Sequence, residues 1–296
     1  MEKLVGFIGL GIMGRPMAKN LIKAGFKLMV FDIDKGSVEE VVEAGATKGD
    51  LAEIGARCDV IFTILPNGKV VQKVLFGEKG VASAMKSGSI VVDMSSVTPV
   101  ESGFCAEKLK ALEADFLDAP VSGGEPKAID GTLAFMVGGE KEVFDSVMPY
   151  FQAMGSSMLL TGGTGSGSVT KLVNQIIVNL NITAVAEGLV FAQKVGADPK
   201  LVYEAIRGGL AGSTVLDAKA PLMFNRAFNP GGKISVNHKD IKNVLDTAHA
   251  MDVPLPMTAQ LFEIMQTLKI MDCFDDDHCA IVKYFERLAD VEVKCR

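Results

Sequence analysis

The sequence lacks the features that place a protein in a membrane, on a nucleic acid or in an oxidising compartment. Its five cysteines are scattered and include no CxxC pair, which argues against a disulfide framework and for a reducing compartment. Its net charge of -6, with acidic and basic residues interspersed, provides no basic field for nucleic acid or an anionic membrane surface. Its apolar runs are shorter than the ~20 residues that span a bilayer, and no small-residue cleavage site follows the first residues. We therefore expect a mature cytoplasmic protein that binds neither nucleic acid nor membranes.

A metal-binding pattern is also lacking. The segment CFDDDHC, from Cys273 to Cys279, comes closest to one. Aspartate is favoured at helix starts, so we interpret this segment as a loop whose aspartates cap a helix that begins near His278. The sequence predicts no metal site.

The order of the elements indicates two domains. In the first half, short β-rich runs such as KLVGFIG, DVIFTIL and SIVVDMSS alternate with helical patterns, which predicts a parallel sheet built from βαβ units. The runs AFMVGG and SMLLTGG are expected as later strands of that sheet, and the glycine-rich GGTGSGS at 162–168 ends the pattern. Only amphipathic helical patterns follow. We predict an α/β domain over residues 1–163 and an all-helical domain over residues 164–296.

A dinucleotide-binding fingerprint lies at the start of the chain. GLGIMG follows a predicted strand and precedes a predicted helix, and Asp32 ends the next strand. These glycines permit a tight turn and a close approach of backbone to a pyrophosphate, while the acidic residue would accept hydrogen bonds from ribose hydroxyls. A 2′-phosphate would be repelled, so NAD is favoured over NADP, although Lys35 softens the discrimination. The predicted cofactor contacts here are Gly9, Leu10, Gly11, Ile12, Met13, Gly14 and Asp32.

Two further loops follow predicted strands of the same sheet, where ligands bind in such folds. Leu65, Pro66 and Asn67 follow one strand and Ser96 follows another. All four are candidate cofactor contacts. A structural role as a turn residue is an equal alternative for Asn67.

A second group of polar residues lies later in the chain. In DAPVSGG, at 118–124, Ser122 offers a hydroxyl, and Gly123 and Gly124 offer backbone amides that suit a carboxylate. Further on, Lys171, Asn174 and Gln175 share one face of an otherwise apolar helix. Buried polar groups are costly unless they are paired, so this cluster either hydrogen-bonds internally or faces a wet cleft.

Four motifs occur in order along the chain: GFIGLGIMGRPMAKNL at 6–21, DAPVSGGEPKAIDGTL at 118–133, GSGSVTKLVNQ at 165–175 and HKDI at 238–241. Together they make the chain resemble the β-hydroxyacid dehydrogenase family over essentially its whole length. The resemblance implies a Rossmann-type N-terminal domain and an all-α C-terminal domain joined by a long helix, with assembly as a homodimer or homotetramer.

The resemblance also implies roles for individual residues. Lys171 matches the family's catalytic lysine and would be the general acid, because an ammonium can stabilise the charge that develops on a carbonyl oxygen and can deliver the proton. Ser122, Gly123 and Gly124 match the substrate-carboxylate loop. Asn174 matches a substrate-orienting amide, Gln175 stands where the family often has a second Asn, and Ser213 is a further candidate substrate contact. Lys239 matches a lysine beside the cofactor.

These observations predict an NAD-dependent reductase for a short acid that carries an aldehyde and a hydroxyl. A dehydrogenase for 3-hydroxyisobutyrate, 4-hydroxybutyrate or a similar hydroxy acid is the alternative within the family. A non-catalytic dinucleotide-binding sensor would keep the fingerprint without an acid–base residue, so Lys171 and Asn174 speak against it. A decarboxylating enzyme of the 6-phosphogluconate type would need a larger helical domain.

Overall fold

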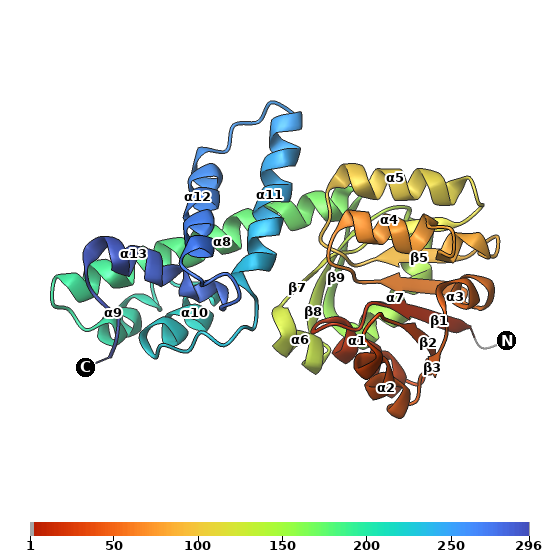
Figure 1. Cartoon of the computed structure of the whole chain (residues 1–296), viewed down its shortest axis with the longest axis horizontal. Coiled ribbons are helices and arrows are strands. Elements are labelled where there is room, and N and C mark those ends of the chain that lie inside the picture. The colour runs from red at the N-terminus through yellow and green to blue at the C-terminus, as the bar shows by residue number, and fades with distance from the viewer. Residues whose placement is uncertain (1–2, 296) are drawn as a thin grey trace. The chain divides into compact units, whose positions relative to one another are not determined.

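The computed structural model describes residues 3–295, which form two compact units that divide between Lys171 and Leu172 (Figure 1). The expected domain division at 163/164 precedes helix α8 (Ser166–Lys194), whereas the two units divide inside this helix. The first turns of α8 hydrogen-bond to the sheet of the first unit, as described below, and for that reason they belong with it.

The first unit is an α/β fold built on one sheet, in which the described residues form nine strands. Its order is β3-β2-β1-β4-β5-β6-β8-β7, and β9 pairs with β8. The pairs from β3 to β6 are parallel, while β8 runs antiparallel to β6 and β7 and parallel to β9. The strands are β1 (Leu4–Ile8), β2 (Lys27–Phe31), β3 (Thr47–Lys48), β4 (Val60–Thr63), β5 (Ile90–Asp93), β6 (Asp115–Asp118), β7 (Val121–Ser122), β8 (Leu133–Gly138) and β9 (Gly155–Gly162).

Helices cover both faces of this sheet. The core on one face includes side chains of α1, α2, α6 and α7, and the core on the other face includes side chains of α3, α4 and α5. The helices are α1 (Gly14–Lys23), α2 (Lys35–Glu43), α3 (Leu51–Arg57), α4 (Gly68–Phe76), η1 (Val81–Ser83), α5 (Pro99–Lys110), α6 (Gly124–Asp130) and α7 (Lys141–Met154). The predicted α/β class and the parallel βαβ organisation are confirmed.

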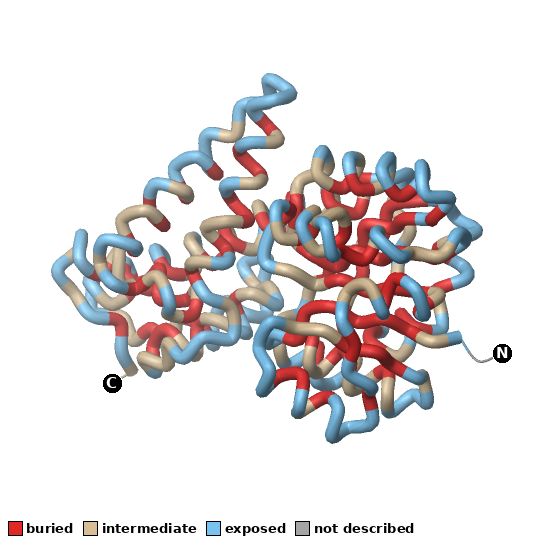
Figure 2. Tube along the Cα trace, turned by 45° about the vertical axis from the view of Figure 1, so that its right-hand side comes forward, coloured by how far each residue is buried: buried red, intermediate tan, exposed pale blue. Residues whose placement is uncertain are grey.

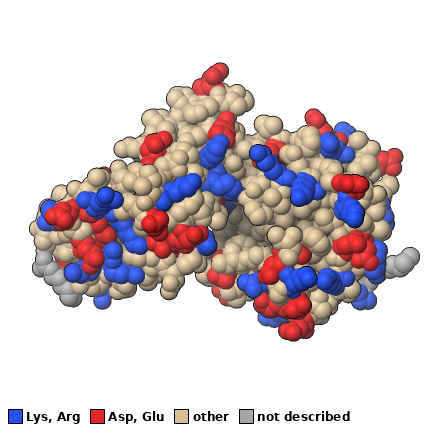
Figure 3. Space-filling view, in the orientation of Figure 1, with Lys and Arg blue, Asp and Glu red and all other residues tan. Residues whose placement is uncertain are grey.

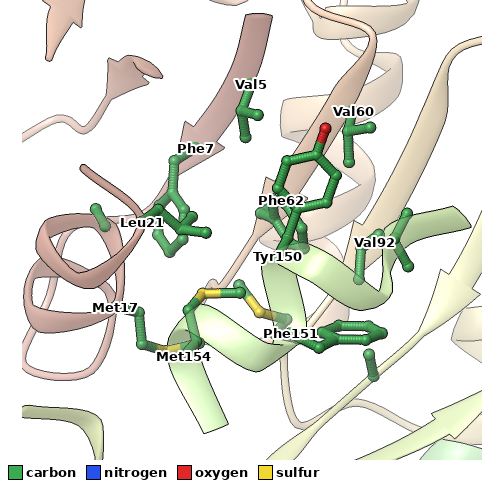
Figure 4. Close-up of a cluster of buried hydrophobic side chains, with 14 of the residues drawn as sticks. Val5, Phe7, Met17, Leu21, Val60, Phe62, Val92, Tyr150, Phe151 and Met154 are labelled. Carbon is green, nitrogen blue, oxygen red and sulfur yellow. The ribbon is translucent and has the colours of Figure 1, made fainter. Parts of the chain in front are cut away.

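Alternation along the strands supplies both cores. Successive side chains of a strand point to opposite faces, so Val5 and Phe7 of β1 lie in one core and Ile8 lies in the other. Figure 4 shows the first of these cores, where Phe151 of α7 packs near Phe62 of β4, with ring centroids 6.4 Å apart. The central strands β1, β4 and β5 are buried on both faces, which explains their continuous apolar sequences.

The expected later strands are also present. The run AFMVGG forms most of β8, and SMLLTGG forms most of β9. The sequence pattern did not indicate that β8 runs antiparallel to β6. Strand direction depends on how the connecting segment returns to the sheet, and alternation along one strand carries no such information.

The second unit consists of helices around its own core. Strand pairing among its described residues is limited to one isolated bridge, between Lys233 and Asp277. Figure 2 shows buried residues within this unit and exposed residues on its outer turns. Besides α8, its helices are α9 (Pro199–Ile206), α10 (Thr214–Phe224), α11 (Ile234–Ala250), α12 (Pro256–Ile270), η2 (His278–Ile281) and α13 (Val282–Ala289).

Helix α8 is strongly apolar, and part of it is a core helix. By length and composition it is the one helix among residues 3–295 that could cross a bilayer, because an 18-residue stretch of it has a mean hydropathy of 1.5. Ile182, Ala186 and Leu189, however, pack into the core of the second unit. Burial in a protein core accounts for part of this composition, and we interpret α8 as a core helix whose other apolar side chains, such as Ile177 and Phe191, are exposed in the single chain.

The segment from Cys273 to Cys279 has the predicted capping role. Asp277 is the N-cap of η2, and its carboxylate accepts a hydrogen bond from the Cys279 backbone N–H at 3.0 Å. The helical turn therefore begins at His278, as the sequence predicted. Among residues 3–295 no group of three or more His, Cys, Asp or Glu side chains is arranged to hold a metal ion.

Candidate functional site

The glycines of the fingerprint form the turn between β1 and α1. Gly9 has φ +100°, and a Cβ there would lie 2.2 Å from the Ile64 carbonyl oxygen. A Cβ on Gly14 would lie 1.9 Å from the Gly9 carbonyl oxygen, whereas one on Gly11 would meet nothing within 4 Å. Gly9 and Gly14 are thus required by the close packing of the turn, and Gly11 leaves open space in which a pyrophosphate can approach the backbone.

A cavity of about 380 Å³ opens beside this turn. Its walls include five of the six residues of the predicted fingerprint segment, together with Asp32, Leu65 and Pro66 and the α4 side chains Val70 and Val74. The exception is Leu10, whose side chain is buried in the core. Glycine backbone, one carboxylate and apolar walls fit the pyrophosphate, ribose and base of a dinucleotide. The fingerprint residues that line it are Gly9, Gly11, Ile12, Met13 and Gly14.

The carboxylate of Asp32 is fixed at the wall of the cavity. One oxygen accepts the Leu10 N–H at 2.5 Å, and the other accepts the Asp34 N–H at 2.8 Å. Each oxygen retains acceptor capacity for a ligand hydroxyl. Asp32 therefore places a carboxylate of fixed position at the cavity wall, directly after β2.

Asn67 and Ser96 lie outside the described lining of this cavity. The side chain of Asn67 accepts the Val70 N–H at 3.0 Å and caps α4, which agrees with the structural alternative noted for this residue. Ser96 is half-buried in the segment after β5.

A buried carboxylate, Asp93, supports the Leu65 loop and was missed from the sequence. Asp93 ends β5 and accepts hydrogen bonds from the hydroxyls of Thr63 at 2.8 Å and Ser95 at 2.5 Å. The Ser95 hydroxyl in turn accepts the Leu65 N–H at 2.8 Å. Burial raises the pKa of Asp93. An acidic residue that ends an apolar strand, as in SIVVDMSS, was the available sequence signal.

Ser122, Gly123 and Gly124 connect β7 to α6 at the other end of the strand order: Ser122 ends β7 and Gly124 begins α6. Gly123 has φ +140° and Gly124 has φ +70°, both in the region that favours glycine. A Cβ on Gly123 would also lie 2.7 Å from the Lys127 side chain. The loop therefore exposes backbone that a larger residue would block.

Lys171 reaches this loop from α8. Its Nζ donates a hydrogen bond to the Val121 carbonyl oxygen at 2.9 Å. Since Val121 directly precedes Ser122, the ammonium lies beside the predicted carboxylate loop. The structure thus brings two separately predicted elements together within the first unit.

Asp118 holds the start of α8. It is the first residue of DAPVSGG at 118–124, and the sequence predicted no role for it. It ends β6 and accepts the backbone N–H groups of Gly165 and Ser168, each at 2.7 Å. Burial raises its pKa to about 6.

In the second unit, Asn174, Gln175 and Lys239 gather around the buried Asp240. Gln175 Nε2 donates to Asp240 Oδ2 at 2.7 Å, and Lys239 Nζ lies 2.8 Å from Asp240 Oδ1. Asn174 Nδ2 donates to Gln175 Oε1 at 3.0 Å. Of the two readings left open for the polar face of α8, internal hydrogen bonding therefore describes Gln175. Asp240 lies within the HKDI motif at 238–241 but was not among the predicted site residues.

Ser213 lies apart from this cluster of hydrogen bonds. Its hydroxyl accepts the Leu216 N–H at 2.9 Å and so caps α10. It is also 3.4 Å from Asn181 Oδ1. The pattern Ser-Thr-Val-Leu before an apolar run is a local signal for this cap.

A side-chain hydrogen bond joins two helices of the first unit. Asn20 of α1 donates to the Ala128 carbonyl oxygen of α6 at 2.8 Å, which ties the fingerprint helix to the helix that begins at Gly124.

The charged side chains of the whole chain are mixed in sign on the face seen in Figure 3, where Lys and Arg are interspersed with Asp and Glu. No extended field of one sign is evident on that face.

Both units match models of known protein families. Residues 4–163 match the NAD-binding domain of 6-phosphogluconate dehydrogenase, and residues 165–285 match the NAD-binding domain of NADP-dependent 3-hydroxyisobutyrate dehydrogenase.

The chain is also similar to several known proteins over nearly its whole length. The chain is 44% identical to 2-hydroxy-3-oxopropionate reductase of Escherichia coli, over 97% of this chain and 98% of that protein. It is 37% identical to 2-(hydroxymethyl)glutarate dehydrogenase of Eubacterium barkeri, over 99% of each. Among solved structures, 3-hydroxyisobutyrate dehydrogenase of Mycobacterium tuberculosis with L-serine is similar, with a TM-score of 0.88 and 27% identity over 96% of this chain and 99% of that one.

Proposed function

Because the chain belongs to the β-hydroxyacid dehydrogenase family, as an NAD-dependent enzyme that acts on CH–OH groups, we propose that it reduces tartronate semialdehyde (2-hydroxy-3-oxopropanoate) to D-glycerate. The observation that carries the proposal is the contact of Lys171 Nζ with the Val121 carbonyl, 2.9 Å away and next to Ser122. The choice of substrate draws on the 44% identity to the Escherichia coli reductase. It also draws on the segment IRGGLAGSTVLDAKAP at 206–221, which resembles the tartronate semialdehyde reductases.

In this proposal Lys171 is the general acid. NADH, when bound, supplies the hydride that reduces the aldehyde carbon. As that carbon is reduced, the carbonyl oxygen gains negative charge and takes a proton from the Lys171 ammonium. The product alcohol leaves, and the neutral amine regains a proton from water. The reaction consumes one NADH and one proton for each aldehyde reduced.

The Ser122 loop binds the substrate in this scheme. The Ser122 hydroxyl and the backbone of Gly123 and Gly124 hold the carboxylate, because the positive φ values of the glycines leave their amides unobstructed. Its place beside Lys171 sets the aldehyde next to the proton donor. A short acid is thus favoured over a long one.

The remaining predicted residues take secondary roles in the proposal. Asn174, with Gln175 behind it, orients the substrate, and Asp240 holds Gln175 and Lys239 in place. Ser213 is a further substrate contact, and Lys239 and Ser96 are cofactor contacts. Asp32 makes NAD the preferred cofactor and NADP the weaker one, because its charge repels a 2′-phosphate.

The proposed substrate is tested by comparing two aldehyde acids. A site built to hydrogen-bond a hydroxyl rejects the analogue that lacks it, since its own polar groups are left unpaired. Tartronate semialdehyde should therefore be reduced with higher kcat/KM than methylmalonate semialdehyde, which carries a methyl group in place of the hydroxyl. The opposite preference would favour 3-hydroxyisobutyrate as the physiological partner, a choice that the similarity to solved 3-hydroxyisobutyrate dehydrogenases also supports.

We further propose that the enzyme acts in the cytoplasm as a homodimer or homotetramer. Exposed apolar side chains on α8 support assembly, with Ile177 60% and Phe191 69% exposed in the single chain. Sedimentation of the purified protein decides between a monomer and either assembly.

A further inference from the structure

The first turn of α8 is held by a carboxylate that comes from the sheet. Each oxygen of Asp118 accepts one backbone N–H at 2.7 Å, Oδ1 from Gly165 and Oδ2 from Ser168. The first N–H groups of a helix have no partner within the helix. Asp118 supplies the missing acceptors from a residue 50 positions away from Ser168 in the sequence.

Close packing fixes the same turn against the strands. A Cβ on Gly167 would lie 2.4 Å from the Met136 carbonyl oxygen and 2.5 Å from the Asp118 carbonyl oxygen. A Cβ on Gly138 would lie 2.6 Å from Asp118 Oδ1. The helix can approach Asp118 this closely only because both positions are glycine.

A buried hydroxyl pair joins the turn to a second helix. The hydroxyl oxygens of Ser168 and of Ser102, on α5, lie 2.9 Å apart. The start of α8 is thus held from β6, from β8 and from α5. It has little freedom to rotate or slide.

We infer that Asp118 is the positioning residue for Lys171, fixing the register of α8 so that the ammonium meets the Val121 carbonyl beside the Ser122 loop. Lys171 lies three residues after Ser168, within one helical turn of the N–H that Asp118 holds. A shift of this turn moves Lys171 directly. The inference rests on the proposed role of Lys171 as the proton donor.

A carboxylate suits this position better than the amide of the same shape. Asp118 offers two acceptor oxygens to two N–H donors, whereas asparagine offers one oxygen and an NH₂ group that would face an N–H. Asp118 is 1% exposed, so the lost hydrogen bond is not replaced freely by water. The helix start would then shift or open.

The test is Asp118→Asn, placed in the wild type and in Lys171→Ala. In the wild-type background, kcat per NADH-binding site should fall by ~10- to 100-fold, as expected for a displaced catalytic group. In the Lys171→Ala background the same substitution should change the residual turnover by less than about twofold, because Asp118 acts through Lys171. Counting NADH-binding sites removes any loss that comes from unfolded protein.

A second readout does not depend on activity. Hydrogen–deuterium exchange in the peptide 163–172 should accelerate in Asp118→Asn. The matched control is Asp93→Asn, since Asp93 is also 1% exposed and is the register partner of Asp118 on β5, yet holds Thr63 and Ser95 instead of α8. That control should weaken NADH binding and leave exchange at 163–172 unchanged.

The outcomes distinguish the positioning role of Asp118 from the general-acid role of Lys171. Equal losses of turnover in both backgrounds, or no loss in a folded Asp118→Asn protein, would overturn the positioning role. If Lys171→Ala alone retains normal turnover, the proposed general acid is wrong and the positioning role falls with it. Asp118→Ser, which keeps one small acceptor, serves as a second variant if Asp118→Asn does not fold and should show the same dependence on Lys171.

Discussion

The carboxyl edge of the sheet holds two regions built in opposite ways. Around β1, β2 and β4, a cavity of about 380 Å³ is formed by glycine backbone, apolar side chains and one half-buried carboxylate, Asp32. Around β6 and β8, the space is filled by the start of α8, which a buried carboxylate, Asp118, and two glycines hold in place. The first region is open and ready to receive a ligand. The second is closed, and its polar groups fix one helix, which suits a region that carries the proposed proton donor, Lys171.

A substitution of Lys171, in the closed region around β6 and β8, should remove catalysis without removing NADH binding. Lys171→Ala should lower turnover by at least ~10²-fold, the typical cost of losing a general acid, while NADH affinity stays within about twofold. Stopped-flow turnover and NADH fluorescence titration measure the two quantities. Lys194→Ala, at the other end of the same helix, is the control and should keep normal turnover. A folded Lys171→Ala protein with near-normal kcat would contradict the assignment.

A substitution of Asp32, in the open region around β1, β2 and β4, should have a smaller effect and should change the preference between NADH and NADPH. Asp32→Ser removes the charge that faces a 2′-phosphate and should raise the NADPH/NADH ratio of kcat/KM roughly tenfold, equivalent to about 1.4 kcal/mol. Asp34→Ser is the matched control, because Asp34 caps α2 two residues further on and is no part of the cavity lining. An unchanged ratio in Asp32→Ser would remove Asp32 from the cofactor site.

The smallest expected effect concerns stability and pH. Burial raises the pKa of Asp118 to about 6 from an ordinary value of 3.8, so its favourable contribution is complete below pH 3.8 and is lost as the pH rises through about 6. The free energy of unfolding of the wild type, relative to Asp118→Asn, should therefore fall between pH 4 and pH 7, by roughly 3 kcal/mol at most. Urea unfolding at several pH values measures this difference. A free energy of unfolding that rises with pH relative to Asp118→Asn would contradict the raised pKa of Asp118.

Sequence reasoning succeeded where the signal was local. Gly9, Gly11, Gly14 and Asp32 lie within one βαβ unit, and their spacing between a predicted strand and a predicted helix correctly predicted the turn between β1 and α1. The capping role of the aspartates before His278, which the structure assigns to Asp277, was predicted for the same reason, since an N-cap acts on the next few residues.

The parts that escaped prediction depend on residues far apart in the chain. Asp118 binds Ser168, Asp93 supports Leu65, and Gln175 on α8 binds Asp240 on α11. No periodicity records such pairs, because each partner satisfies its local pattern without the other. Such pairs occur in the closed region, behind the Leu65 wall of the open cavity and in the second unit, so both regions of the sheet edge contain contacts that the sequence did not reveal.

The bond between Asn20 and the Ala128 carbonyl constrains how this enzyme can be redesigned. It joins α1, which begins inside the fingerprint, to α6, which begins at the last glycine of the Ser122 loop. A chimaera that imports the nucleotide-binding segment of a relative must therefore import a compatible α6 as well, or keep an amide at position 20. Otherwise an exchange intended only to alter the cofactor will also disturb the Ser122 loop, to which we assign the binding of the substrate carboxylate.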